Sequence, residues 1–235
     1  MKPIFFFLLL LFPFVSPAQT DNRGGWYAGI GVARMHYKTN WYYHRFDGNP
    51  RYDNYPIHSI NSNMITLSLE KRSLFKAGPV HFDLSGDLLL GITAKAKGEW
   101  LPDDDVISGG GKAAGINVLL KAVYPLPLTG KVGIAPFIGL GPQFTFLHNN
   151  GKDAGEFASN AYYSYTEGWN EYVLLFNGAA GVNFEFSSVT ITPAVHFGLI
   201  GTSFTDWEPN EDGVQMESSP ANFGFSIKAA FRLGR

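Results

Sequence analysis

The sequence contains no cysteine, so neither disulfide bonds nor thiolate metal ligands contribute to this protein. Net charge is also small, because 18 Lys and Arg stand against 20 Asp and Glu, for a formal charge of −2. Nucleic-acid binding needs a basic patch or stripe, so this near balance gives no support for a nucleic-acid partner. No G-x-S-x-G sequence occurs, and the three glycines at 109 to 111 are expected in a loop, so neither a hydrolase elbow nor a phosphate cradle is indicated.

The only long apolar run spans residues 4 to 15, between Lys2 and the small-residue sequence Ser16-Pro17-Ala18. This pattern predicts a secretory signal peptide at residues 1–18, with cleavage after Ala18. The run is too short to cross a bilayer as a helix, and no later stretch is long enough. We therefore expect an exported protein whose mature part, residues 19–235, forms one domain.

What the sequence has in place of apolar runs is a two-residue alternation, clearest from residue 80 to 95. In a strand, successive side chains point to opposite faces. One face here would carry Val80, Phe82, Leu84, Leu88, Leu90, Ile92 and Ala94, and the other His81, Asp83, Ser85, Asp87, Thr93 and Lys95. Such a strand is long enough to cross a bilayer obliquely.

The alternation predicts eight strands, at 25–37, 59–72, 79–95, 112–124, 131–147, 169–186, 189–200 and 221–233. Short connections at 73–78, 125–130 and 187–188 alternate with long ones at 38–58, 96–111, 148–168 and 201–220. This alternation is typical of an all-β, eight-stranded, antiparallel up-and-down transmembrane barrel. We expect it in the bacterial outer membrane, in contact with outer-membrane lipid, with both termini periplasmic and the long loops outside. Pro136 and Pro193 are expected to cause bulges or strained pairings, because proline cannot donate to a sheet ladder.

The predicted strands assign each residue to lipid or lumen. The lipid-facing set includes Trp26, Ala28, Ile30 and Val32; Ile65, Leu67 and Leu69; Ile116, Val118, Leu120 and Tyr124; and Phe223, Phe225, Ile227, Phe231 and Leu233. The lumen is predicted to hold a charge network of Glu70, Asp83, Asp87, Lys121, Glu185, Lys228 and Arg232. An eight-stranded lumen is filled by side chains, so we expect paired charges and little or no ion conduction. Lys121 is expected to pair with Asp83 or Asp87.

The first predicted strand, GWYAGIG at 25–31, and the last, FGFSIKAAF at 223–231, resemble those of small eight-stranded outer-membrane barrels of the outer-membrane protein A or X type. The resemblance covers the mature chain as a pattern of strands. It implies the barrel fold and a choice of roles: membrane anchoring, adhesion, assistance to envelope machinery, or lipid-modifying catalysis. Fold alone does not decide among them.

Catalytic and metal sites find little support. Lipid A deacylases of barrel form use a histidine and a serine close together on the lipid-facing wall, whereas His196 is expected to face inward in VHFG, 195–198, with no neighbouring serine. The acidic groups at 103–105 and at Glu208, Glu211 and Asp212 lack the ordered spacing of a calcium loop. We therefore assign no catalytic, cofactor or metal residues.

The outward loops are rich in aromatic residues, which are enriched at binding surfaces and also form the girdles of membrane barrels. The possible recognition residues are Trp41, Tyr42, Tyr43, Phe46, Tyr162, Tyr163, Tyr165 and Trp169. The leading hypothesis is a non-enzymatic outer-membrane barrel whose loops bind a protein or glycan partner or serve envelope maintenance. The alternatives are an outer-membrane lipid-modifying enzyme and a soluble lipocalin-like carrier with the two faces reversed.

Overall fold

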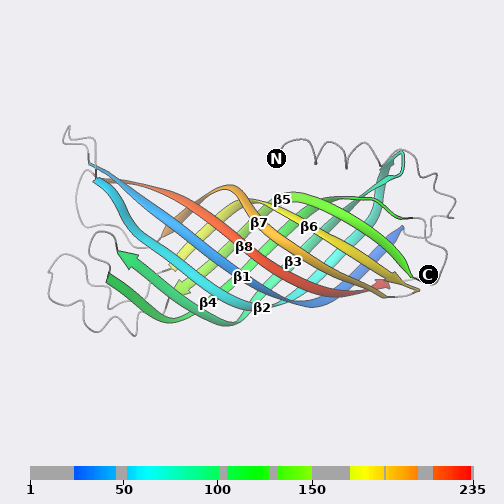
Figure 1. Cartoon of the computed structure of the whole chain (residues 1–235), viewed down its shortest axis with the longest axis horizontal. Helices are drawn as coiled ribbons and strands as arrows, with labels where there is room; N and C mark the ends of the chain where they lie inside the picture. Colours follow the sequence, from blue (N-terminus) through cyan, green and yellow to red (C-terminus); the bar gives the residue numbers. More distant parts are fainter. Residues whose placement is uncertain are drawn as a thin grey trace.

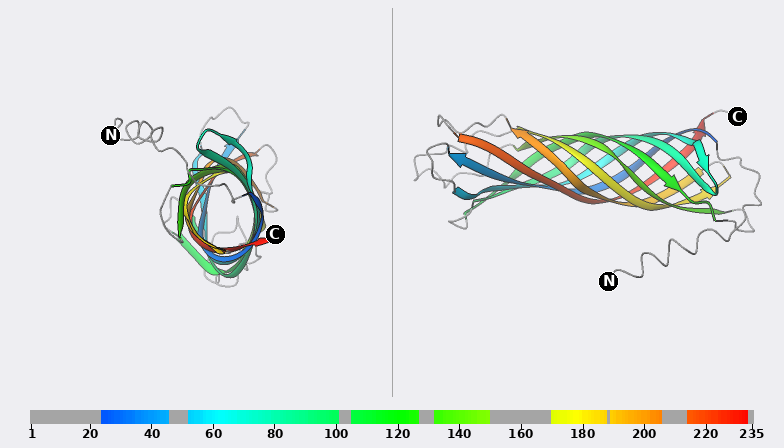
Figure 2. Two further views of the ribbon diagram at one scale, coloured as in Figure 1. Left: turned by 90° about the vertical axis from the view of Figure 1, so that its right-hand side faces the viewer. Right: turned by 90° about the horizontal axis from the view of Figure 1, so that it is seen from above.

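The computed structural model describes residues 24–45, 52–100, 105–126, 132–149, 170–187, 189–205 and 214–233, with side chains except at 41–45, 52–58, 96–100, 105–109, 149 and 214–217. These residues form the strands β1 (Gly25–Arg45), β2 (Tyr52–Ala77), β3 (Val80–Trp100), β4 (Asp105–Val123), β5 (Gly133–Asn149), β6 (Asn170–Phe186), β7 (Val189–Thr205) and β8 (Val214–Leu233). Each strand pairs antiparallel with its sequence neighbours, and β8 pairs with β1 to close a barrel. Figure 1 shows the tilted strands, and Figure 2 the closed ring. The predicted eight-stranded barrel is confirmed.

The barrel has two distinct ends. At the turn end, β1 begins and β8 finishes with Trp26 opposite Leu233, and short connections join β2 to β3, β4 to β5 and β6 to β7. This end lies to the right in Figure 1. At the loop end, the segments between strands are 46–51, 101–104, 150–169 and 206–213, which lie outside the described residues. The start of β1 and the end of β8 therefore lie side by side at the turn end.

The two faces of the wall differ in chemistry as the alternation predicts. On β8, Phe225 and Ile227 are exposed on the outer face, whereas Ser226 and Lys228 are buried in the lumen. The same pattern places Ile30 and Val32 of β1 outside. Tyr124 was expected to face lipid but is buried, because β4 ends at Val123 and Tyr124 lies beyond the regular alternation.

The predicted signal peptide lies outside the described residues. No helix in the described part of the chain is long and apolar enough to cross a membrane.

The strands extend further toward the loop end than predicted. Expected loops at 38–58 and 96–111 are largely strand: β1 pairs with β2 out to Tyr43 opposite Tyr52, and β3 pairs with β4 out to Trp100 opposite Asp105. The three glycines at 109 to 111 belong to β4 and not to a loop. Backbone pairing needs no apolar face, so a polar strand extension carries no hydrophobic alternation to reveal it.

Neither proline causes a bulge, but the β6–β7 pairing is interrupted beside Pro193, between Gly181 opposite Ala194 and Phe184 opposite Ile191. The β5–β6 register runs unbroken past Pro136, and the β7–β8 register runs unbroken past Pro193. The carbonyl of Pro136 accepts a hydrogen bond from the backbone N–H of Tyr124 at 2.9 Å, which lies just past the end of β4. Pro136 has no N–H to donate, but it lies just beyond the last β4–β5 pair, so no ladder hydrogen bond is lost there.

A register shift in β3 instead exchanges faces near the loop end. Asn63 lies opposite Thr93 while Met64 lies opposite Gly91, so β3 carries one extra residue there. As a result Thr93 points outward, where the Asn63 side-chain amide donates to its hydroxyl at 3.0 Å, and Ala94 packs against the lumen cluster. Thr93 and Lys95 were expected to face the lumen, and that prediction is wrong because of this bulge.

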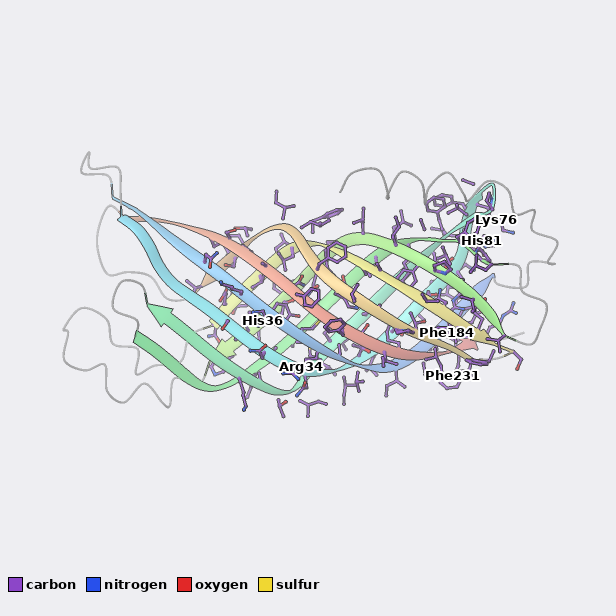
Figure 3. All side chains as sticks on the ribbon, in the orientation of Figure 1. Arg34, His36, Lys76, His81, Phe184 and Phe231 are labelled. Atoms are coloured by element: carbon purple, nitrogen blue, oxygen red, sulfur yellow. The ribbon has the colours of Figure 1, made fainter. Side chains whose placement is uncertain are left out.

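At the turn end, the β2–β3 hairpin continues past a kink at Ser73. Ser73 has a φ of 50°, its N–H donates to the Asp83 carboxylate at 2.7 Å, and its hydroxyl lies 2.8 Å from His81 Nδ1. The chain reverses only at Gly78, with a φ of +60°, so the expected turn at 73–78 is mostly strand. Figure 3 labels Lys76 and His81 on this hairpin.

The seam between β7 and β8 is less regular than the others. Its ladder ends at Phe197 opposite Phe223, although both strands continue toward the loop end. There the hydroxyl of Ser218 accepts from the N–H of Ser203 at 2.7 Å and donates to its carbonyl at 3.0 Å. A side chain thus substitutes for part of the ladder.

Candidate functional site

The turn-end half of the lumen is organised around Arg72, which is only 2% exposed. Its guanidinium donates to Glu70 at 2.5 Å and to Thr190 at 2.9 Å, and lies 3.4 Å from Glu185. It also lies over the ring of Tyr27, 3.9 Å from the centroid. These partners come from β1, β2, β6 and β7, so a single side chain ties half of the strands together. The charge prediction missed Arg72, although it shares the face of Glu70 two residues earlier.

Glu70 bridges Arg72 to Lys121. The Lys121 ammonium donates to the second carboxylate oxygen of Glu70 at 2.5 Å and lies 5.2 Å from the ring centroid of Phe137. The expectation that Lys121 pairs with Asp83 or Asp87 is therefore wrong, even though Asp83 is its backbone neighbour. A long flexible side chain in a narrow lumen reaches past the adjacent strand, so backbone register does not fix its partner.

Lys228 crosses the lumen from β8 to Asp87 on β3. Its ammonium donates to both carboxylate oxygens, at 2.8 and 3.0 Å. Three buried carboxylates, Glu70, Asp83 and Asp87, thus share this half of the lumen with three buried cations, Arg72, Lys121 and Lys228. This balance is what burial demands, because an uncompensated buried charge costs several kcal/mol, of order 3–5.

The remaining predicted network residues lie nearer the turn-end opening. Glu185 is partly buried, with its side chain 20% exposed beside Arg72. Arg232 is exposed and donates to the carbonyl of Gly24 at 2.9 Å, so the structure does not place it in the buried cluster as expected. Arg232 is exposed because it is the second-last residue of β8, which ends at Leu233, where the lumen opens.

The loop-end half of the lumen is mainly apolar. Its cluster consists of Ala33, Met35, Tyr37, Ile60, Met64, Leu89, Ala113, Leu147, Val173 and Leu175. A short hydrogen-bonded chain crosses it, in which Asn222 donates to Gln143 at 3.0 Å and Gln143 donates to Tyr37 at 3.1 Å. Thr39 donates to the buried Glu171 nearer the loop end. The lumen is thus filled along its length by two different kinds of packing.

His196 faces the lumen as expected, but it does have a serine neighbour. Its Nε2 lies 2.8 Å from the hydroxyl of Ser226, which comes from β8 and is therefore invisible in the local sequence. The pair borders an internal void of about 10 Å³ whose lining also includes Asp87 and Lys228. That volume is about enough for one water molecule. The pair faces inward with no space for an acyl chain or a peptide.

For the predicted recognition residues, the structure describes either the backbone alone or nothing. Trp41, Tyr42 and Tyr43 belong to the end of β1, where the backbone alone is described. Phe46, Tyr162, Tyr163, Tyr165 and Trp169 lie outside the described residues, as do Asp103, Asp104 and the acidic residues at 208 to 212. Within the described ranges, no group of three His, Cys, Asp or Glu side chains could hold a metal ion.

No protein-family model matches the sequence, and no curated protein matches it. The chain itself is a closed barrel of eight antiparallel strands. Several solved outer-membrane proteins are similar to it. The outer membrane protein OprG from Pseudomonas aeruginosa is 11% identical, with a TM-score of 0.47 over 91% of this chain and 98% of that chain. The outer membrane protein AlkL is 13% identical, with a TM-score of 0.47 over 94% and 97%. The attachment invasion locus protein Ail of Yersinia pestis is 13% identical, with a TM-score of 0.40 over 90% and 99%.

Proposed function

We propose that this protein is a non-enzymatic barrel of the bacterial outer membrane that anchors its loop end at the cell surface as a binding platform. The observation that carries the proposal is the combination of an apolar outer wall with a lumen closed by Arg72, Glu70, Lys121, Asp87 and Lys228. An extended apolar wall would be an aggregation hazard in water but is solvated by lipid. In the described part of the lumen, paired charges at the turn end and apolar packing at the loop end supply rigidity, and the void beside His196 is only about 10 Å³.

Two rival functions are less well supported. A lipid-modifying enzyme needs a nucleophile and base open to lipid, whereas the His196–Ser226 pair is buried in the lumen beside a void of about 10 Å³. A soluble lipocalin-like carrier needs a charged exterior around an apolar lumen, whereas the outer wall here is largely apolar and the turn-end half of the lumen contains ion pairs. A protein or glycan would be recognised at the loop end, where the segment between β5 and β6 contains Tyr162, Tyr163 and Tyr165.

Membrane placement is tested by protease treatment of whole cells. We expect cleavage within 46–51, 101–104, 150–169 or 206–213, and protection of the turn-end connections until the outer membrane is permeabilised. Cleavage confined to the segment between β4 and β5 in intact cells would invert the proposed topology. Planar-bilayer recordings add a second test, with a porin as the positive control. We expect no large stable current steps from the purified barrel, because side chains fill the lumen.

Binding at the loop end is tested on cells that display the protein. Bound amounts would be measured against a panel of immobilised glycans and extracellular proteins. Replacing Tyr162, Tyr163 and Tyr165 by serine should reduce any binding seen, whereas replacing Asp103 and Asp104 by serine is the matched loop control. Equal binding by both variants would remove the aromatic residues from the proposal.

A further inference from the structure

Within the described residues, the lumen contains charges of both signs, whereas the outer wall carries charges of one sign only. Every carboxylate with a described side chain lies in the lumen or at its opening: Glu70, Asp83, Asp87, Glu171 and Glu185. The charged side chains on the outer face of the same ranges are all basic: Arg34, Lys38, Lys71, Lys76, Lys95 and Lys112. The described outer wall is therefore positive wherever it is charged, despite the near-neutral chain.

A polar notch interrupts the outer apolar wall on β1, β2 and β3. Arg34 lies opposite Asn63, and Asn63 lies opposite Thr93. The next outward-facing row toward the loop end contains His36, Asn61 and Lys95. His36 Nδ1 lies 2.9 Å from the side-chain Oδ1 of Asn61. On the other side of β1, the same two positions face Phe225 and Phe223. Polar groups thus lie at a level where the adjacent strand is still aromatic, and the β3 bulge is what brings Thr93 and Lys95 there.

A hollow of about 380 Å³ lies in the outer wall beside this notch. Its outward lining consists of Val32, Ile92, Phe225 and Ile227, with Arg34 and Asn63 on its polar side. Figure 3 shows Arg34 and His36 on the part of β1 nearer the loop end. The site therefore combines a cation and an apolar depression on the lipid-facing surface.

The cations of the notch differ from those of the lumen in having no partner among the side chains that the structure describes. Within the described part of the chain, neither Arg34 nor Lys95 makes a hydrogen bond or an ion pair with another side chain. The Thr93 hydroxyl accepts from Asn63, which leaves its own proton free to donate. Donors without acceptors, beside an apolar depression, fit a ligand that carries both an anionic group and a hydrocarbon chain.

We propose that this notch and hollow bind a phosphate-bearing membrane lipid, with its headgroup phosphate on Arg34 and its acyl chain in the hollow. Arg34 donates to the phosphate in the bidentate geometry that guanidinium groups favour. Thr93 supplies a further donor, and Lys95 adds positive charge at the next row outward. A soluble anion would leave the hollow unused, and a protein partner would have to enter the bilayer to reach it. The inference rests on the proposed membrane placement and adds a specific lipid site to it.

The test uses the purified full chain in bilayers of phosphatidylcholine with a minor fraction of phosphatidic acid. Lipid that stays bound after transfer to mild detergent is measured by native mass spectrometry. We expect retention of phosphatidic acid over phosphatidylcholine. The Arg34→Gln variant should lose about tenfold in that preference, because a hydrogen bond to a charged group is commonly worth that factor, and Arg34→Lys should lose less. Lys71→Gln, which changes an outward cation at the turn end, is the matched control and should retain the preference.

Two further arms separate the parts of the proposal. The Ile227→Trp variant fills the hollow without changing charge and should reduce retention of phosphatidic acid. Glycerol phosphate, which has the headgroup chemistry but no acyl chain, should not displace the lipid. Unchanged preference in Arg34→Gln, with normal heat-dependent gel mobility as evidence of folding, would overturn the site. Full displacement by glycerol phosphate would show an anion site and not a lipid site. Whole-cell protease protection is read separately, so failure of the lipid assay leaves the proposed topology standing.

Discussion

The cations of the lumen and those of the outer wall have opposite surroundings. Arg72, Lys121 and Lys228 are each buried and each paired with a carboxylate at hydrogen-bonding distance. Arg34 and Lys95 are exposed on the outer face and have no ion-pair partner within the described residues. Because the described carboxylates all serve the lumen, the outer cations remain available to anions from the membrane. Basic side chains thus stabilise the barrel from within and recognise lipid on its outer wall.

The largest expected effect follows from removing the shared carboxylate of the lumen. Glu70→Leu deprives Lys121 of its ion pair and Arg72 of its shortest one, so the free energy of unfolding should fall by about 3–5 kcal/mol. Reversible urea unfolding in lipid vesicles measures this. The control is Lys38→Met, an exposed outer cation, which should change stability by about 0.5 kcal/mol or less. Equal losses in both variants would show that the inner and outer cations do not differ energetically.

Lys228 and Asp87 allow the same comparison within one pair. Lys228→Met should cost about 3 kcal/mol, because it leaves the Asp87 carboxylate buried without its cation. Adding Asp87→Leu should restore part of that loss, since the double variant contains neither charge. A double-mutant cycle gives the coupling energy. Strict additivity of the two single changes would contradict the pairing.

The sequence predicted much of this arrangement because the barrel imposes a period of two on every crossing strand. Ile30 and Phe225 were placed outside and Lys121 and Lys228 inside on that basis alone, and the structure has them there. Face assignment failed where a bulge changes the period without a marker residue, as at Thr93. Pro136 was misleading for a different reason: it needs no bulge, because it lies where the β4–β5 ladder is ending.

Partners within the lumen could not be predicted from the same pattern. Lys121 and Glu70 come from β4 and β2, which are not adjacent in the sheet, and Arg72 reaches β6 and β7. These contacts depend on side-chain length and on the width of the lumen, and neither is encoded in strand order. The pairing of His196 with Ser226 is likewise a contact between strands. Most of the lumen charges were predictable, although Arg72 was missed and Arg232 is exposed, whereas the pairs were not.

Two glycines show how tightly the inner and outer faces of the barrel wall are packed. A Cβ added at the inward-facing Gly141 would lie 2.0 Å from the Val118 carbonyl oxygen, whereas one at Gly86 would meet nothing within 4 Å. Gly141→Ala should therefore force the β4 and β5 backbones apart and cost about 1–3 kcal/mol. Gly86→Ala is the control and should be neutral or slightly stabilising. Urea unfolding checks both, and a neutral Gly141→Ala would mean that β4 and β5 separate more readily than their register indicates.

The smallest expected effect concerns the seam between β7 and β8, where the Ser218 hydroxyl replaces ladder hydrogen bonds to Ser203. Ser218→Ala removes both bonds, and each is worth about 1 kcal/mol or less where water can replace it. Global stability should therefore change little. Local opening should change more, because the β7–β8 ladder ends at Phe197 and does not extend to Ser203. Hydrogen exchange of the Ser203 amide should accelerate in Ser218→Ala and stay unchanged in the neighbouring exposed variant Ser219→Ala. Equal exchange in all three proteins would mean that the seam is held by contacts other than this hydroxyl, and that the outer wall is as firmly closed there as beside the lumen ion pairs.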